Sequence, residues 1–525
     1  MTRRLRALKR WMASQGIDSS DGLEIRDDDA GIRVVSTRDL GEGEAVARIP
    51  KSACLTARAS GAREAIEEAG LGGSLGLAAA VMYERALGEE SAWAGYLQAL
   101  PRREAVPVAW EAGEIDEFLV GTELHKTVKE DKALIYEDWK ECILPLLSSA
   151  PLKLEPRSFG YDQYVDAKSL VASRSFEIDN YHGFGMVPLA DLFNHKTGAE
   201  NVHFTNVSSD SESDNDQNVE DQNGHYDDYS DNLSTDDLPS EINGSPTFFS
   251  GETCGNGNNM EDASSSEVDL SVLEMIIVKG VKSGDEVFNT YGSMGNAALL
   301  HRYGFTELDN PYDIVNIDLK LVIDWSSSQF SSRYTRARVS MWRRFDLSGC
   351  VSQNSEYFEI SSEGEPQLEL LILLYVIFLP DGVYHKLNQM VMPSGDISKA
   401  ISTILSVKHN TSISLEDLDM VKDCLLIDKV CRGLVSLAEI RERYYGETSL
   451  DDDEKKLMNC CKSNKKLYHS LVLEYSHLAF LYSFLPRERG RTRRMATFSS
   501  DGRFGLRSCP DCGKGGLTPE QRGER

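Results

Sequence analysis

Two short, largely apolar stretches that carry several polar side chains constrain this chain more than any other part of it. The first runs from Gly185 to His195, GMVPLADLFNH, and places Asp191, Asn194 and His195 among core-type residues. The second runs from Glu286 to Phe305, EVFNTYGSMGNAALLHRYGF. Buried polar groups cost free energy unless they are hydrogen-bonded, so we expect the two polar stretches to share one site. Either stretch alone is also typical of a capped helix end or a structural histidine.

Composition limits the classes of function. The 525 residues predict two or three domains, and the formal net charge of −28 disfavours direct nucleic-acid binding. No Lys or Arg lies between Thr197 and Val278, and the 19 acids there leave −9 of the −28 for the rest of the chain. Residues 206–267 are rich in Ser, Asp, Asn and Gly, which predicts a disordered acidic loop.

The expected compartment is the cytoplasm or nucleus. Ten cysteines lack a disulfide-framework spacing, which favours free thiols. Met1 to Arg10 is basic, but no apolar signal segment follows it. A plastid location is less favoured because Asp18 and Asp21 appear early. The most apolar segment, Leu368 to Leu379, is too short to span a bilayer, so no membrane partner is expected.

The pattern of apolar residues predicts an N-terminal helix over 1–22 and strands from Leu23 to Pro50. Ile32 to Val35 and Ala45 to Ile49 are expected to form one hairpin around the turn at Asp39 to Glu44. Residues 51–170 are predicted to form a helical insert. Its expected core anchors are three tryptophans, Trp93, Trp110 and Trp139.

A further helix is predicted over Phe159 to Ile178, which places Arg174 near its end and next to the first polar stretch. Val268 to Val278 reads as a strand, so the acidic loop is expected to interrupt a β-hairpin domain.

Residues 312–485 are predicted to form a separate α-helical domain. Strand-type residues from Ile314 to Leu321 come before its helices, which are expected over Arg333 to Phe345, Gln367 to Leu379, Asp396 to Ser406, Ser414 to Tyr445 and Leu450 to Leu485. The tail, 486–525, is basic, and its Cys509 and Cys512 are half of a zinc site or part of a disordered segment.

The chain resembles SET-domain protein lysine methyltransferases of the Rubisco large-subunit methyltransferase, non-histone type. Four segments within Leu23 to Phe305 carry the resemblance. They are Thr37 to Glu44 with Ile49-Pro50-Lys51, Ser173 to Phe176, Pro188 to His195, and Asn289 to Gly292 with Asn296 and Tyr303-Gly304-Phe305.

The resemblance implies an α+β fold. It would be a β-rich SET fold with a pseudoknot and an inserted helical subdomain, followed by an all-α C-terminal domain. On this basis the SET domain covers 23–305, and 312–485 is similar in placement to the family's substrate-binding domain.

The resemblance also implies S-adenosyl-L-methionine as the cofactor, a lysine of a non-histone protein as the methyl acceptor, and no metal. Tyr291 and Tyr303 would be catalytic, and Asp191 and Tyr303 would face the substrate. The residues implied in cofactor binding are Gly31, Ile32, Arg33, Arg174, Asn194, His195, Tyr291 and Phe305. One departure weakens the expected cofactor contacts at the hairpin: Arg33 stands where the family usually has the second glycine of a G-x-G turn.

Two other functions stay open from the sequence. One branch of the family methylates histidine but lacks an aromatic residue where Tyr303 stands. A catalytically silent scaffold that binds a protein partner is the other alternative, although Tyr291 and Asn194 are both present. The expected partner is a protein that presents a lysine, and the chain is expected to be a monomer.

Overall fold

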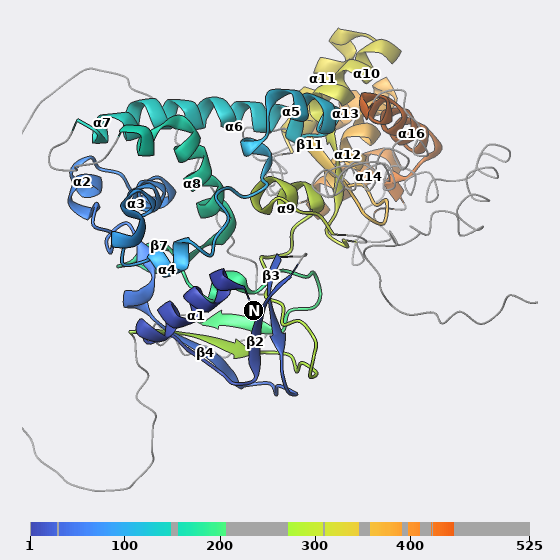
Figure 1. Ribbon diagram of the computed structural model, residues 1–525. Helices are drawn as coiled ribbons and strands as arrows, with labels where there is room; N and C mark the ends of the chain where they lie inside the picture. The colour runs from blue at the N-terminus through green and yellow to red at the C-terminus, as the bar shows by residue number, and fades with distance from the viewer. Residues whose placement is uncertain are drawn as a thin grey trace, which may run out of the picture.

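The computed structural model describes residues 2–28, 31–148, 156–205, 271–307, 310–345, 357–390, 397–409, 422 and 424–445 (Figure 1). Four predictions lie outside the described residues: the acidic loop at 206–267, the start of the helix expected from Ser414, the helix over Leu450 to Leu485, and the tail with Cys509 and Cys512.

A four-stranded antiparallel sheet organises the N-terminal body. Its order is β1 (Asp18–Ser19), β4 (Ala45–Pro50), β9 (Val272–Ile277) and β8 (Val202–Thr205). Ile49 of β4 faces Leu273 of β9, and both side chains are fully buried. β8 and β9 pair directly although the acidic loop separates them in the sequence, so the prediction that the loop interrupts a hairpin is confirmed.

A separate hairpin consists of β2 (Leu23–Asp28) and β3 (Gly31–Ser36). The prediction that Ala45 to Ile49 returns along Ile32 to Val35 is therefore wrong. Leu40 forms a bridge with Val281, and the chain then continues into β4, which pairs with β1 and β9. A turn signal fixes where the chain bends, whereas long-range packing decides which strand becomes the partner.

A third sheet leads into the first polar stretch. Its order is β5 (Leu55–Thr56), β7 (Gly183–Met186) and β6 (Ser175–Asp179). The helix predicted over Phe159 to Ile178 ends at Arg174, because the next residues pair with β7 as β6. This correction matters for the site, since it places Arg174 at the junction of a helix and a strand.

Helices cover these sheets. α1 (Arg3–Ser14) begins after Thr2, whose hydroxyl accepts the Leu5 N–H, and its apolar face packs into the same core as β4. Trp93 and Trp110 are buried as predicted, whereas Trp139 is only partly buried. The helices of the insert are α2 (Arg63–Glu68), α3 (Gly73–Leu87), α4 (Ala94–Leu97), α5 (Ala112–Phe118), α6 (Leu124–Asp138), α7 (Leu144–Leu146) and α8 (Tyr161–Arg174).

Short 3₁₀ or π turns connect these elements, and α9 (Asn296–Tyr303) ends the N-terminal body. The turns are η1 (Lys51–Ala53), η2 (Gly88–Glu90), η3 (Pro107–Ala109), η4 (Trp139–Ile143), η5 (Pro156–Phe159), η6 (Ala190–Leu192) and, in the C-terminal unit, η7 (Arg443–Tyr445).

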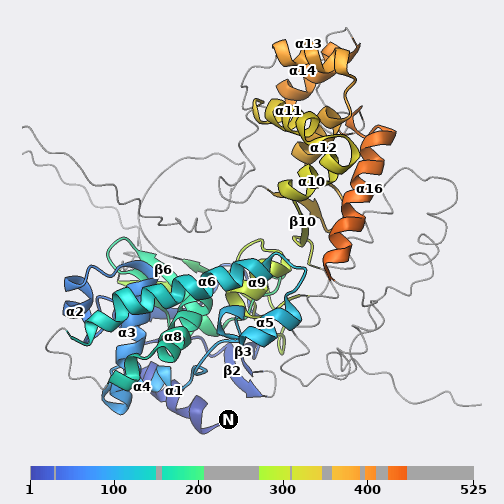
Figure 2. The same cartoon turned by 90° about the horizontal axis from the view of Figure 1, so that it is seen from above.

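The C-terminal unit extends away from the sheets and has its own core (Figure 2). Strand β10 ends at Asp318, and a helix that the sequence analysis missed starts at Leu319, where the buried residues change to helical spacing. The elements are β10 (Ile314–Asp318), α10 (Leu319–Gln329), α11 (Ser332–Arg343), β11 (Tyr357–Ser361), α12 (Leu368–Ile377), α13 (Asp381–Met390), α14 (Ile397–His409) and α16 (Asp428–Glu442). Leu370 to Ile377 are fully buried, so the most apolar segment is a core helix as predicted.

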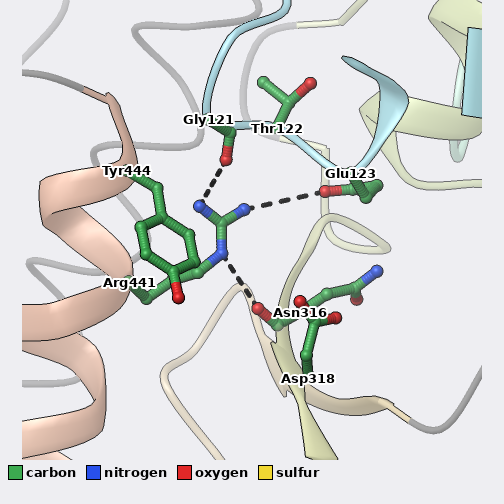
Figure 3. Close-up of a pocket in the computed structure, with 7 residues that line it drawn as sticks. All are labelled: Gly121, Thr122, Glu123, Asn316, Asp318, Arg441 and Tyr444. Carbon is green, nitrogen blue, oxygen red and sulfur yellow. Dashed lines mark hydrogen bonds and ion pairs between the residues drawn. The ribbon is translucent and has the colours of Figure 1, made fainter. Parts of the chain in front are cut away.

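Arg441 of α16 connects the C-terminal unit to the helical insert (Figure 3). Its Nε donates to the carbonyl oxygen of Asn316 at 3.0 Å, and its Nη1 donates to that of Gly121 at 2.6 Å. These residues line a hollow of about 320 Å³ together with Thr122, Glu123, Asp318 and Tyr444. Within the described ranges, no helix is long and apolar enough to cross a membrane.

Candidate active site

The two polar stretches meet, as the sequence predicted. The backbone N–H of Asn289 donates to the carbonyl of Asn194 at 2.9 Å, and His195 pairs with Asn289 in a parallel bridge. The N–H of Tyr291 donates to Nδ1 of His195 at 3.0 Å. The two stretches therefore pair through their backbones, and the His195 ring accepts a further backbone N–H from the second stretch.

His195 acts as a hydrogen-bond acceptor in this contact. Because Nδ1 accepts a backbone N–H, the ring proton lies on Nε2, which faces the Thr197 hydroxyl at 3.1 Å and the Glu307 carboxylate at 3.6 Å. Burial lowers the pKa of His195, although the Glu307 charge acts in the opposite direction. The ring is therefore neutral at pH 7. It also stacks on Tyr291 with ring centroids 5.1 Å apart.

Four rings form an aromatic cluster: His195, Tyr291, Tyr303 and Phe305. The rings of Tyr291 and Tyr303 lie 4.5 Å apart, and Phe305 lies 6.3 Å from Tyr291 and 6.2 Å from Tyr303. α9 ends at Tyr303, and Gly304 then adopts a left-handed conformation with φ of 76°. A Cβ at Gly304 would lie 2.7 Å from the Ala105 backbone, so only glycine lets the chain turn here and bring Phe305 to the cluster.

The Tyr291 hydroxyl lies inside the site and donates to the carbonyl oxygen of Phe193 at 3.0 Å. Burial raises the pKa of Tyr291, so the phenol stays protonated at neutral pH. With its proton committed to Phe193, the oxygen still has lone pairs that can accept a hydrogen bond from another group. Tyr291 can therefore orient a ligand, whereas a role as a strong base does not fit.

Arg174 links α8 to the first polar stretch. Its Nη1 donates to the backbone carbonyl of Asp191 at 2.9 Å and lies 3.4 Å from the Asp191 carboxylate. Its Nε donates to Glu104 at 2.5 Å, and the Tyr96 hydroxyl donates to Asp191 Oδ2 at 2.9 Å. Two carboxylates, one guanidinium and one phenol therefore form a connected network behind the aromatic cluster.

The charges in this network are unequal. Burial raises the pKa of Asp191 to about 6, although Arg174 and Tyr96 favour its charged form. Burial opposes the charge of Arg174, but the carboxylates of Glu104 and Asp191 outweigh it and raise the Arg174 pKa. Asp191 Oδ1 is buried and has no hydrogen-bond partner among the described residues. Burial therefore makes the charged form of Asp191 unfavourable, and its side-chain hydrogen bonds are made by Oδ2.

The hairpin residues Gly31, Ile32 and Arg33 belong to β3, which joins the site through the backbone. The N–H of Val287 donates to the carbonyl of Val34 at 2.9 Å. Gly31 is exposed with φ of 112°, and open space surrounds the position where a Cβ would stand. The structure brings eight of the ten predicted site residues together through hydrogen bonds, ion pairs and ring contacts, whereas Gly31 and Ile32 adjoin the site only as the residues that precede Arg33 in β3.

Sequence reasoning missed four residues of this region: Tyr96, Glu104, Glu286 and Glu307. Glu286 begins the second polar stretch but was given no role, and the other three lie outside the quoted stretches; each makes contacts across long sequence separations. The separation between Tyr96 and Asp191 is 95 residues. No local pattern marks such partners. Within the part of the chain that the structure describes, no group of three His, Cys, Asp or Glu could hold a metal ion.

Comparisons with known proteins agree with the fold. No family model matches the chain. It is 25% identical to N-lysine methyltransferase setd6 of Xenopus tropicalis, over 65% of this chain and 62% of that protein. It is also 25% identical to ribosomal lysine N-methyltransferase 3 of Saccharomyces cerevisiae, over 55% of this chain and 59% of that protein. The chain therefore spans about three fifths of the length of these curated relatives.

Solved structures extend the comparison. The structure of Rubisco LSMT bound to AdoMet superimposes with a TM-score of 0.57 at 16% identity, covering 95% of this chain and 94% of that one. The SET domain of LSMT bound to lysine and AdoHcy superimposes with the same TM-score and covers 96% of this chain and 92% of that one.

The chain has the fold of the solved SET domain of LSMT, and its two polar stretches meet within that fold. Its arrangement is that of the Rubisco large-subunit methyltransferase type, so the resemblance and the α+β fold class predicted from the sequence are confirmed.

Proposed function

We propose that this chain is a protein-lysine N-methyltransferase that transfers a methyl group from S-adenosyl-L-methionine to a lysine of a non-histone protein. One observation carries the proposal: a protonated Tyr291 hydroxyl lies within a cluster of aromatic rings and donates to the Phe193 carbonyl. The chain's similarity to proteins named as lysine methyltransferases supports the same reaction.

The residues present fit the cofactor. Gly31 leaves the hairpin backbone open to a ligand, and Asn194 is exposed, directly before His195 of the aromatic cluster. Arg174 keeps its positive charge but already pairs with Glu104 and Asp191, so it would act on the cofactor by positioning the Asp191 segment. We assign cofactor binding to Gly31, Ile32, Arg33, Arg174, Asn194, His195, Tyr291 and Phe305. When bound, the cofactor supplies an activated methyl group on its sulfonium.

The protein must provide a neutral, aligned amine. A free lysine has a pKa near about 10.4, and removal from water lowers this value because burial disfavours the charged form. The faces of Tyr291 and Tyr303 suit an amine that arrives as a cation. The Tyr291 oxygen would accept an N–H of the amine and hold its lone pair in line with the methyl group. We assign Tyr291 and Tyr303 to catalysis, and Asp191 with Tyr303 to the substrate side.

The two alternatives find less support. Tyr303 packs against Tyr291 at the position where the histidine-methylating branch lacks an aromatic ring, which favours lysine. A catalytically silent scaffold would not need a positioned Tyr291 hydroxyl or Asn194 amide. Here the hydroxyl donates to the Phe193 carbonyl, and the amide donates to Glu286.

We further propose the partner, the domain bounds, the oligomeric state and the location of this protein. The partner is a protein that presents a lysine, and the unit at 312–485 helps to bind it. SET domain bounds of 23–305, a monomeric state and a cytoplasmic or nuclear location complete the proposal.

Labelled S-adenosyl-L-methionine tests the function directly. Wild-type and Tyr291→Phe protein are incubated with extract from cells that lack the protein, and labelled residues are identified. Label on lysine that the variant fails to transfer supports the proposal. The proposal fails if the wild type labels no protein, or if it labels only histidine.

A further inference from the structure

Arg33 stands where the resembled family usually has a glycine, and its guanidinium faces two carboxylates. Its Nη2 donates to the Asp28 carboxylate at 2.5 Å, and its Nη1 lies 3.9 Å from Glu286. Its Nε is buried and has no partner in the described part of the chain. The side chain is about one third exposed, at 36%. The guanidinium therefore lies between Asp28 of the hairpin and Glu286 of the second polar stretch.

Glu286 joins Arg33 to Asn194. Its Oε1 accepts the Nδ2–H of Asn194 at 2.7 Å, while its Oε2 faces Arg33. The backbone fixes this position, because Val35 pairs with Glu286 in an antiparallel bridge. A row of side chains from Asp28 to Asn194 thus connects the hairpin to the first polar stretch.

The row determines how the Asn194 amide is turned. Because the Nδ2–H of Asn194 donates to Glu286, the NH₂ end of the amide faces Glu286. The carbonyl oxygen then points the other way, and the residue is exposed. An amide without such a neighbour could present either end to a ligand.

We infer that Arg33 is a positioning residue for the cofactor: by holding Glu286, it fixes the Asn194 amide so that its carbonyl oxygen receives an N–H or O–H donor of the cofactor. The inference rests on the proposed function, since it names how the same site selects its cofactor. Arg33 thus contributes a side-chain network that reaches Asn194 through Glu286.

Calorimetric titration with S-adenosyl-L-homocysteine measures the effect without turnover. Arg33→Gly should weaken binding about threefold to tenfold, and Arg33→Lys should restore most of it, because a cation again faces Glu286. Glu286→Gln should weaken binding to a similar degree, and adding Arg33→Gly to it should give little further loss, as expected of two residues that act in series.

The hairpin offers a matched control. Arg26 lies directly opposite Arg33 in the register and pairs with Glu24 on the exposed side. Arg26→Gly removes the same charge from the same hairpin, and binding should not change. In turnover assays, the effect of Arg33→Gly should appear in the KM for S-adenosyl-L-methionine more than in kcat.

The outcomes separate the two proposals. If the wild type binds no S-adenosyl-L-homocysteine, the proposed function fails. If the wild type binds it and Arg33→Gly and Glu286→Gln bind it equally well, the role of Arg33 is refuted and the function stands. A loss with Arg26→Gly as large as that with Arg33→Gly would also refute it. If Arg33→Gly does not fold, Arg33→Lys and Glu286→Gln carry the comparison.

Discussion

Replacing Tyr96 with phenylalanine tests how the Asp191 carboxylate is held. Tyr96 is fully buried, and its hydroxyl donates to Asp191 Oδ2 at 2.9 Å. Among the described residues, the variant leaves Arg174 as the partner of Asp191 Oδ2. A hydrogen bond to a charged group contributes about 1.5–3 kcal/mol, so Tyr96→Phe should lower the free energy of unfolding by that amount at pH 8.

The loss should shrink as the pH falls. The pKa of Asp191 is about 6 in the folded protein, above its ordinary value of 3.8. A raised carboxyl pKa means that protonation favours the folded state progressively as the pH falls through 6 toward 4. At pH 5.5, which lies below this pKa, the protonated form of Asp191 predominates. The lost hydrogen bond then involves a neutral group, which contributes about 1 kcal/mol.

Urea unfolding at pH 5.5 and pH 8 measures both values. Tyr164→Phe is the matched control, because Tyr164 is also fully buried and its hydroxyl meets Asp138 Oδ2 at a longer 3.4 Å. Its cost should be smaller and equal at the two pH values. An equal cost of Tyr96→Phe at both pH values would refute the idea that burial leaves Asp191 near its protonation midpoint.

Three further predictions concern stability. Gly304→Ala should lower the free energy of unfolding by about 2 kcal/mol or more, because it combines a left-handed φ with a clash against the Ala105 backbone. Gly70→Ala, with φ of 69° and open space, should cost only about 1 kcal/mol, and equal costs would contradict this reasoning. Arg441→Met should cost about 3 kcal/mol by urea unfolding, since it leaves the carbonyls of Gly121 and Asn316 without their buried donor, whereas Arg432→Met on the exposed face of α16 should cost little. His195→Asn should lower the Tm more at pH 7.5 than at pH 5.5. The folded pKa of His195 lies below its ordinary 6.5, so the contribution of the neutral ring is present above pH 6.5 and is lost as the pH falls; an effect independent of pH would count against the hydrogen bond from Tyr291.

Local sequence patterns predicted much of this protein correctly. Polar residues embedded in apolar stretches marked Asp191, Asn194 and His195, because such residues must find partners when buried. The same reasoning located the second polar stretch, and Leu368 to Leu379 was long and apolar enough to predict a core helix. These features depend on the chemistry of neighbouring residues, which a sequence displays directly.

Strand pairing and helix ends were harder to predict from the sequence. The turn at Asp39 to Glu44 indicated a hairpin, but β4 pairs with β1 and β9 instead. The α8 helix ends at Arg174 because β7 offers a strand partner to the residues that follow. In both cases a distant segment competes with the local preference, and the sequence does not state which segment will be adjacent.

The sequence by itself therefore indicated that two distant stretches of embedded polar residues had to share one site. Only the tertiary structure decided how their charges are held. Tyr96 and Glu104 reach the site from the helical insert, and Glu286 turns the Asn194 amide from the far end of the second polar stretch. The physical reason is that hydrogen bonds and ion pairs depend on distances of a few ångströms, which packing across the whole body sets.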